Sequence, residues 1–363
     1  MKLPVEGALI DGKVVPGQLE IVDGRISAYG LNGTGGRGIA APGFVDLQVN
    51  GFGGVDFLDA DADGYRRAGE ALLETGVTSY LPTLITAPEE QLVAALAEVP
   101  TNAGGPTVLG VHLEGPFLAA RRLGMHPPAG RRDPDVELLE RLLAAGPVRL
   151  MTLAPELPGA LELVEILCAR GVAVSCGHSD ATAEQADAAF DRGACTVTHL
   201  FNAMRPLSHR DPGIVGAALV RDDVVVQIIV DGIHLARATT SLVWRAAAGR
   251  VALVTDAVAA AGAGGGSYSL GSVELSVEDG AVRSPQGLLA GSVLTMLEAV
   301  RNLTELGAPL EQALAAAASV PARVLDLPET GRLDVGLPAD IVVLDDSLEI
   351  ERVLVGGEAL VVA

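Results

Sequence analysis

Eight short apolar runs of β-strand character recur through the middle of the chain, and each is followed by an Ala/Leu/Glu-rich stretch with helical spacing. The runs begin mostly about 20 to 40 residues apart, which leaves room for one helix between successive strands. Repeated β-α units of this length predict an α/β fold, a (β/α)8 TIM-type barrel, in which the chemistry lies where the parallel strands end. The runs begin at residues 43, 77, 108, 148, 172, 195, 224 and 251.

Polar residues stand at or just past the C-terminal ends of these runs. Surface polarity alone would scatter such residues along the chain, whereas the strand ends of a barrel converge on one mouth. The pattern therefore predicts a functional site assembled from several strands. Its members are Gln48, Asn50, His112, Glu114, His178, His199, Asp231, His234 and Asp256.

The two flanks of the chain follow a different pattern. Residues 1–42 and 329–363 alternate apolar residues with turn signals and show no helical period. We expect both termini to form one small β-sandwich domain, and residues 43–328 to form the catalytic barrel. Residues 262–290 are expected to form a glycine-rich loop followed by a hairpin, inserted after the eighth strand.

Composition excludes several classes of function. A formal net charge of −21 argues against nucleic acid or an acidic membrane surface as a partner. No apolar stretch approaches the roughly 18 residues of a membrane span. Lys2 and Lys13 are the only lysines, so the barrel has no Schiff-base, carboxylated or P-loop lysine. A small anionic substrate stays compatible with this composition if arginines create a local positive site.

Three cysteines, Cys168, Cys176 and Cys195, lie inside apolar segments. Their odd number and apolar setting indicate buried thiols, with a role in metal binding as the alternative. The N-terminus also lacks the apolar region of a signal peptide. These features predict a cytoplasmic protein.

Glu114, His178 and His199 end the third, fifth and sixth runs, so a barrel would bring them together. Taken singly, either histidine could equally be a buried residue with satisfied hydrogen bonds. One carboxylate and two imidazoles with an open position for water are, however, a common ligand set of catalytic zinc. The three residues together predict a site for a divalent metal ion.

Asp256 ends the eighth run, across the predicted barrel from the metal ligands. There it could take a proton from an activated water molecule and return it to a leaving group; the alternative is an aspartate that caps the next loop. His234, just past the seventh run, is suited to polarise a substrate carbonyl or to hold a hydroxyl, or else is a structural loop histidine. His112 shares a strand face with Glu114 and is expected to pack or to support it.

Two loops carry positive charge in this acidic chain. Residues 201–213 contain Asn202, Arg205, His209 and Arg210. They are the best candidate for an anion site because guanidinium binds phosphate through paired hydrogen bonds, and a solvated loop is the alternative. Residues 121–132 form a second basic, Gly/Pro-rich loop that could act as a lid.

Seven motifs in the chain are distinctive in combination. They are A-P-G-F-V-D-L-Q-V-N-G, H-L-E-G-P-F, G-H-S-D-A-T, T-H-L-F-N-A-M, D-G-I-H-L, V-T-D-A-V and L-A-G-S-V-L-T-M. In order and spacing the chain resembles the N-acetylglucosamine-6-phosphate deacetylases of the amidohydrolase superfamily. The resemblance spans nearly the whole chain, including the β-sandwich built from both termini.

The resemblance implies roles for the matched positions. Glu114, His178 and His199 would bind the metal, and Asp256 would act as general base and then as general acid, with His234 also catalytic. A homodimer is implied, in which Arg210 or His234 serves the site of the neighbouring subunit. The positions implied to hold the sugar phosphate are Met125, Asn202, Ala203, Arg210, Asp231, Gly232, Ile233, His234, Leu289, Ala290 and Gly291.

One departure concerns the number of metal ions. Most amidohydrolases carry His-x-His at the end of the first strand, where this chain has Gln48 and Asn50. Amide side chains are poor ligands for a transition metal, and no barrel lysine is available to bridge two ions. The family includes a subgroup with this pattern that works with one metal. We therefore expect one divalent ion per subunit, zinc in the first place, with iron or another divalent ion as the alternative.

The reaction implied by the resemblance is metal-dependent hydrolysis of N-acetyl-D-glucosamine 6-phosphate to D-glucosamine 6-phosphate and acetate, in amino-sugar catabolism or recycling. Deacetylation of the galactosamine isomer is the alternative among enzymes, because it needs the same groups. A catalytically silent barrel that serves as a scaffold is the alternative from another class, and the loss of His-x-His motivates it. The expected partner is a small sugar phosphate, with neither nucleic acid nor membrane.

Overall fold

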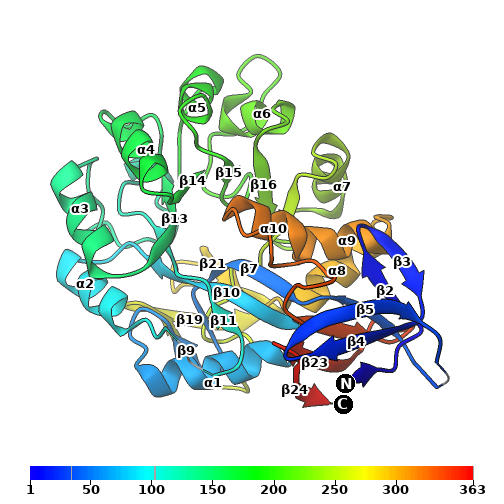
Figure 1. Cartoon of the computed structure of the whole chain (residues 1–363). Coiled ribbons are helices and arrows are strands. Elements are labelled where there is room, and N and C mark those ends of the chain that lie inside the picture. Colours follow the sequence, from blue (N-terminus) through cyan, green and yellow to red (C-terminus); the bar gives the residue numbers. More distant parts are fainter. Residues whose placement is uncertain (34, 102–103, 363) are drawn as a thin grey trace.

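A parallel β-barrel forms the centre of the computed structural model, which describes residues 1–33, 35–101 and 104–362 (Figure 1). Its strands follow one another in chain order, and β7 pairs with β10. Each of the eight predicted runs contains a strand of this barrel, so the predicted fold is confirmed. The barrel strands are β7 (Phe44–Val49), β10 (Val77–Ile85), β12 (Val111–Glu114), β13 (Val148–Leu153), β14 (Ala173–Cys176), β15 (Thr196–Val197), β16 (Val225–Ile228) and β17 (Val251–Leu253).

The barrel closes between its last strand and its first. Val49 and Ala257 form a parallel bridge, and the backbone N–H of Asp256 donates to the carbonyl of Gln48 at 2.9 Å. The strands are rich in Val, Leu and Ile and are almost wholly buried, as expected for a parallel sheet covered by helices outside and filled by side chains inside. Because all the strands run the same way, the polar residues at their C-terminal ends share one mouth.

Helices cover the outside of the barrel (Figure 1). In α1 (Ala62–Leu73), Ala68 and Leu72 are buried on one face, as expected for an amphipathic helix. At the start of α5 (Ala183–Phe190), Thr182 and Gln185 form the capping box that their spacing indicates. The remaining helices are α2 (Glu89–Glu98), α3 (Val136–Ala145), α4 (Ala160–Ala169), α6 (Gly213–Val220), α7 (Arg237–Ala246), α8 (Met296–Glu305), α9 (Leu310–Ala317), α10 (Ser319–Val324) and the 3-10 turn η1 (Ala120–Arg122).

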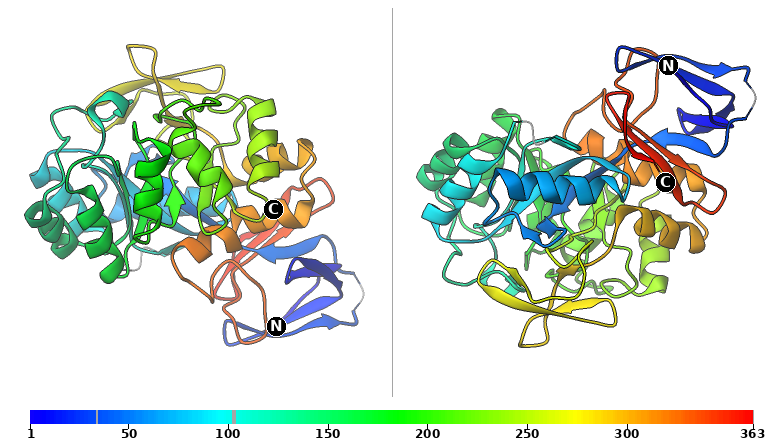
Figure 2. Two further views of the ribbon diagram at one scale, coloured as in Figure 1. Left: turned by 90° about the horizontal axis from the view of Figure 1, so that it is seen from above. Right: turned by 90° about the horizontal axis from the view of Figure 1, so that it is seen from below.

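The two termini build a second, all-β part beside the barrel (Figure 2). Strands from both ends of the chain meet where β6 pairs with β2 and with β22, and a separate apolar core that includes Leu19, Ile26 and Ile341 fills this part. The prediction of a shared terminal domain is confirmed, while its boundaries at residues 42/43 and 328/329 stay a prediction. One sheet contains β1 (Lys2–Leu3), β4 (Gln18–Val22) and β5 (Arg25–Leu31); the other contains β2 (Gly7–Ile10), β3 (Lys13–Pro16), β6 (Ile39–Pro42), β22 (Ile341–Leu344), β23 (Ile350–Val355) and β24 (Glu358–Val362).

The insertion after the eighth barrel strand is larger than the predicted hairpin. It is a four-stranded antiparallel sheet, and its last strand pairs back onto the hairpin. In both views of Figure 2 this sheet lies on the opposite side of the barrel from the terminal strands. It is joined to the rest of the barrel through Gly271 N–H, which donates to Asp56 Oδ2 at 2.7 Å. Its strands are β18 (Tyr268–Leu270), β19 (Val273–Glu278), β20 (Ala281–Arg283) and β21 (Leu289–Ser292).

Three short strands complete the fold. β8 (Gly51–Phe52) and β9 (Val55–Asp56) form a small hairpin after the first barrel strand, and β11 (Thr107–Val108) pairs with β10. None of the helices in the described ranges combines the length and the apolar character needed to cross a bilayer.

Candidate metal centre and active site

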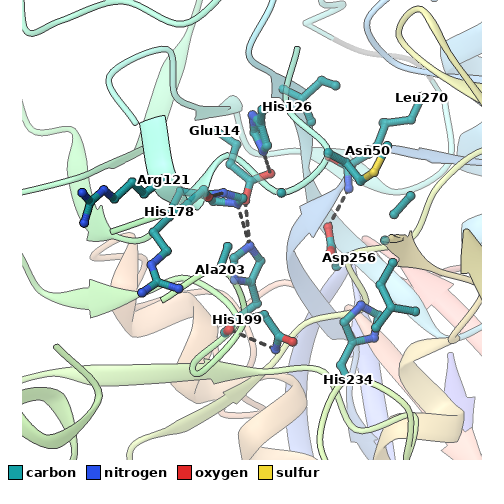
Figure 3. Close-up of a pocket in the computed structure, with 18 residues that line it drawn as sticks. Asn50, Glu114, Arg121, His126, His178, His199, Ala203, His234, Asp256 and Leu270 are labelled. Atoms are coloured by element: carbon teal, nitrogen blue, oxygen red, sulfur yellow. Dashed lines mark hydrogen bonds and ion pairs between the residues drawn. The ribbon is translucent and has the colours of Figure 1, made fainter. Parts of the chain in front are cut away.

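A cavity of about 310 Å³ lies at the C-terminal mouth of the barrel (Figure 3). Its walls come from the strand ends, from the predicted lid loop and from the inserted sheet. Glu114, His126, His178 and His199 gather on one side of the view, and Asn50, Asp256 and His234 lie on the other. The cavity is lined by Asn50, Ile85, Glu114, Arg121, Arg122, Gly124, Met125, His126, His178, His199, Asn202, Ala203, His234, Asp256, Leu270, Leu289, Ala290 and Gly291.

Glu114, His178 and His199 meet at one point, and all three are buried. Glu114 Oε1 lies 3.1 Å from His178 Nε2 and 3.0 Å from His199 Nε2, and the two nitrogens are 3.1 Å apart. Around a tetrahedral zinc ion with bonds of about 2.0–2.1 Å, ligand atoms would be about 3.3 Å from one another. The spacing of the three donor atoms therefore fits a metal ion after a small expansion.

The protonation of His178 supports the same conclusion. Its Nδ1 lies 2.8 Å from the carbonyl oxygen of Arg122, and because a carbonyl only accepts, Nδ1 carries a proton. In the neutral ring Nε2 then presents a lone pair to the carboxylate oxygen of Glu114. Two acceptors at this distance repel each other unless a cation lies between them. The residues thus fit the divalent ion expected from the sequence.

Glu114 is ionised although it is buried. Burial opposes its charge, but the polar contacts of its carboxylate with the rings of His126, His178 and His199 lower the pKa of Glu114 well below its usual value. Gln48 adds a further donor, since its Nε2 lies 3.0 Å from Glu114 Oε1. In this chain an amide therefore supports the metal-facing carboxylate at one of the two positions where most amidohydrolases carry a histidine ligand.

Asp256 lies opposite the metal-binding group with its side chain buried. Asn50 Nδ2 donates to Asp256 Oδ1 at 2.7 Å, which fixes the carboxylate and leaves Oδ2 toward the cavity. Burial, followed by repulsion from the Glu114 carboxylate, raises the pKa of Asp256 to about 6. A carboxylate with this pKa is ionised near neutral pH and is a stronger base than an exposed aspartate.

His234 is oriented by the turn that precedes it. Its Nδ1 donates to Asp231 Oδ2 at 2.6 Å, while Asp231 Oδ1 accepts from the backbone N–H groups of Ile233 and His234, both at 2.8 Å. These bonds use the ring nitrogen that faces Asp231 and leave Nε2 available on the cavity side. Asp231, Gly232 and Ile233 do not line the cavity; the structure places them behind His234 as the turn that holds it.

His126 is a site residue that the sequence analysis did not identify. Its Nδ1 accepts from the backbone N–H of Thr86 at 3.2 Å, so the proton of the neutral ring is on Nε2, which lies 3.5 Å from Glu114 Oε2. Burial lowers the pKa of His126 to about 4, so the ring is neutral. His126 lies in a loop and not at a strand end, and the position-based argument could not detect it. The one available signal was that His126 lies within the basic loop of residues 121–132, which was predicted to act as a lid.

The predicted lid loop contacts the metal-binding group directly. Arg122 forms an ion pair with Asp180, with Nε at 2.9 Å and Nη2 at 2.6 Å from one carboxylate oxygen, and its carbonyl accepts the proton of His178 Nδ1. Asp180 is held in turn by Glu156, whose Oε1 accepts from the Asp180 N–H at 2.6 Å. This loop thus orients a metal ligand, and its place beside the cavity is compatible with the lid expected from the sequence.

Arg121 and Arg122 line the cavity, although the sequence analysis assigned the anion site to residues 201–213. Arg121 is exposed and has no hydrogen bond or ion pair within the described part of the chain. Arg210 is also exposed but lies outside the cavity lining, and Arg205 is paired with Asp211 at 2.5 Å. Within this chain, the arginines at the cavity therefore come from the predicted lid loop.

Of the remaining positions predicted to bind substrate, six line the cavity: Met125, Asn202, Ala203, Leu289, Ala290 and Gly291. His112 does not reach it. Its ring is fully buried between Thr83 Oγ1, 3.3 Å from Nδ1, and Thr152 Oγ1, 2.7 Å from Nε2. This placement agrees with the packing role expected of His112.

Comparisons with known proteins agree with this geometry. Among curated relatives, N-acetylglucosamine-6-phosphate deacetylase of Mus musculus is 44% identical over 344 residues, which cover 89% of this chain and 83% of the relative. N-acetylgalactosamine-6-phosphate deacetylase of Escherichia coli O157:H7 is 38% identical over 328 residues, covering 88% and 87%.

A solved structure is similar over almost the full length. It is that of an aspartate-to-alanine mutant of N-acetyl-D-glucosamine-6-phosphate deacetylase from Mycobacterium smegmatis in complex with N-acetyl-D-glucosamine-6-phosphate. It is 37% identical, has a TM-score of 0.95, and the match covers 99% of both chains. The model of the amidohydrolase family matches residues 39–360. The barrel, the buried Glu/His/His group and these similarities together show that the chain belongs to the amidohydrolase family.

Proposed function

We propose that this protein hydrolyses N-acetyl-D-glucosamine 6-phosphate to D-glucosamine 6-phosphate and acetate, in amino-sugar catabolism or recycling. The observation that carries the proposal is a buried Glu/His/His donor group that faces Asp256 across a cavity. The 44% identity to a curated deacetylase and the similarity to a deacetylase with this sugar phosphate bound support the choice of substrate.

Glu114, His178 and His199 would hold one divalent ion per subunit, and we propose zinc, because two imidazoles and a carboxylate suit it. Such an ion, when bound, acidifies a water molecule and polarises the carbonyl of an amide. Gln48 and Asn50 bind the carboxylates of Glu114 and Asp256 through their amide nitrogens, which supports a single ion.

The proton transfers would be carried by Asp256. Its Oδ1 is occupied by Asn50, so Oδ2 would accept a proton from the attacking water and later deliver it to the leaving amine. The Nε2–H of His126, which lies 3.5 Å from Glu114 Oε2 in the structure, would be redirected to the acetamide carbonyl oxygen as negative charge develops there. His234, oriented by Asp231, would bind the sugar on the other side of the cavity.

The 6-phosphate would be bound at the basic wall of the cavity. Arg121 and Arg122 lie there in a chain of net charge −21, and Arg121 has no partner among the described residues that would compete for a phosphate. In the proposed homodimer, Arg210 would add a second guanidinium from the neighbouring subunit. Its exposure outside the cavity of its own subunit supports that arrangement.

We also propose that the protein is cytoplasmic. All three cysteines are free thiols in the structure. Only Cys176 is buried as predicted, whereas Cys168 and Cys195 are half-buried. Burial raises the pKa of all three thiols. Unreactive, unpaired thiols are the usual state of cysteines in a reducing compartment.

Two other functions are tested by the same experiment. The 38% identity to a curated galactosamine-isomer deacetylase makes that isomer the second candidate substrate. The third candidate is a silent scaffold. The decisive measurement is acetate release from both sugar phosphates by metal-replete protein, together with the metal content of protein purified without added metal.

The expected result is one ion per chain and a higher kcat/KM for the glucosamine isomer. A higher kcat/KM for the galactosamine isomer would reassign the substrate. Absence of both activity and metal would favour the scaffold.

A further inference from the structure

Asp46 lies in the middle of β7, is completely buried, and takes no part in the reaction proposed above. We propose that Asp46 is a positioning residue that, through Thr255, holds the turn from which Asp256 faces the metal centre. The inference rests on the proposed function, because it concerns the residue that transfers the proton.

The contacts of Asp46 converge on the residue before Asp256. Asp46 Oδ2 accepts from the Thr255 hydroxyl at 2.6 Å. Asp46 Oδ1 accepts from the backbone N–H of Thr255 at 3.3 Å and from that of Gln48 at 3.2 Å. A single carboxylate therefore binds Thr255 through both its main chain and its side chain, across the seam where the barrel closes.

Asp256 needs such support because its backbone is strained. Its φ of +50° lies in the left-handed region that side-chain-bearing residues seldom adopt. This conformation lets the chain turn sharply at the end of the last barrel strand and direct the carboxylate into the cavity. The same turn is closed by the N–H of Ala257, which donates to Thr255 Oγ1 at 3.1 Å.

The chemistry of Asp46 suits this position better than a neutral side chain would. It receives three donated hydrogen bonds, which only a carboxylate can accept without presenting a donor of its own. The Thr255 hydroxyl gives its proton to Asp46 and so keeps its lone pairs for Ala257 N–H. An amide at position 46 would place an NH2 group against one of these donors and break that arrangement.

Besides its backbone hydrogen bonds to Gln48 and Ser292, both at 2.9 Å, Asp256 has two supports from side chains. Asn50 fixes its carboxylate directly, whereas Asp46 fixes its backbone through Thr255. Loss of the second support should leave the metal ligands and the sugar contacts in place but misalign the proton acceptor. The loss of activity should therefore appear as a lower kcat, with KM nearly unchanged.

The test uses Thr255→Val, which removes the hydroxyl at nearly constant volume, and Asp46→Asn. Thr255→Ser restores the hydroxyl. Thr196→Val is the matched control, because Thr196 is an equally buried barrel threonine. Its hydroxyl donates to Val225 O at 2.9 Å and accepts from Gln227 Nε2 at 3.1 Å, and neither bond involves Asp46, Thr255 or Asp256. Each variant is assayed for acetate release as the metal-replete full chain, with metal content measured in parallel.

We expect Thr255→Val to lose about 100-fold in kcat, the size of effect seen when a reacting group is displaced by about 1 Å. KM and metal content should stay within threefold of the wild type, Thr255→Ser should recover most of the loss, and Thr196→Val should lose less than threefold. The double variant of Asp46→Asn with Thr255→Val should lose about as much kcat as the more damaging of the two single variants. Both substitutions remove the same contact, so their effects should not add.

A loss below tenfold in Thr255→Val, an equal loss in Thr196→Val, or additive losses would overturn the inference. If Thr255→Val does not fold, Asp46→Asn is judged by the same tenfold limit. A crystal structure of Thr255→Val or Asp46→Asn tests the position of Asp256 without any substrate. Asp256 should lose its contact with Asn50, and a retained contact refutes the inference even if the proposed substrate is wrong.

Discussion

Replacing Asp256 by asparagine isolates proton transfer from every other property of the site. The two side chains have the same shape, so the cavity and the metal-binding group opposite should be unchanged. Asn50 presents a donor, Nδ2, at 2.7 Å from Oδ1 of Asp256. The new amide must therefore turn its oxygen toward Asn50 and its NH2 group toward the cavity. The group that should accept a proton becomes one that can only donate.

The magnitude follows from the role. General base catalysis contributes about 10²- to 10⁴-fold to a rate, which corresponds to about 3–5 kcal/mol of transition-state stabilisation. The kcat of Asp256→Asn should fall by this factor while KM changes little. The stability of the metal-free protein, by contrast, should rise in Asp256→Asn. A pKa raised from 3.8 to about 6 means that ionised Asp256 destabilises the metal-free fold by up to about 3 kcal/mol at neutral pH. The neutral amide removes this cost, which comes from burial of the charge and then from repulsion by Glu114.

The assay compares acetate release by metal-replete wild type, Asp256→Asn and Asp222→Asn. Asp222 is fully exposed, so its replacement makes the same change in net charge away from the site. Metal content and the melting temperature of the metal-free proteins are measured on the same samples. A kcat within tenfold of wild type in metal-loaded Asp256→Asn would show that this carboxylate is not the base. A melting temperature clearly below that of wild type would refute the electrostatic argument.

Three further predictions follow from the same contacts. Glu114→Gln should reduce bound metal to less than about a tenth of an ion per chain, because an amide is a poor ligand; stoichiometric metal in the variant would contradict the assigned ligand set. Arg121→Ala should raise KM for the sugar phosphate by about tenfold or more with little change in kcat, as expected for loss of a charged contact, whereas Arg132→Ala, in the same loop but outside the cavity lining, should leave KM unchanged. Asp256 must be ionised to accept a proton, and burial raises its pKa to about 6. The kcat should therefore fall as the pH decreases below about 6. A bound cation stabilises the ionised carboxylate and would move this fall to lower pH. Persistence of the same acid limb in Asp256→Asn would assign it to another group.

The barrel and the positions of its site residues could be predicted from local pattern. The strand runs are apolar because both faces of a parallel barrel strand are buried, and their spacing matches one helix per strand. Once the strands are parallel, any polar residue at a C-terminal end must reach the same mouth. Glu114, His178, His199 and Asp256 were found in this way, although far apart in the chain.

Other features depend on contacts between segments that no local pattern reports. His126 approaches Glu114 only because the loop after β12 folds back over the mouth, and Asp46 contacts Thr255 only because the last barrel strand closes on the first. In both cases the partner is brought close by the folding of segments that are distant in the chain.

The sequence by itself determined which residues would form strands and helices and which polar residues would share one mouth, because those outcomes follow from periodicity and burial within short segments. Only the tertiary structure decided which basic groups face the cavity, which ring nitrogen of His178 carries its proton, and what holds Asp256 in a strained turn. These are decided by distances of a few ångströms between residues that can be 209 positions apart in the chain. Such distances are fixed when the barrel closes, and no short segment encodes them.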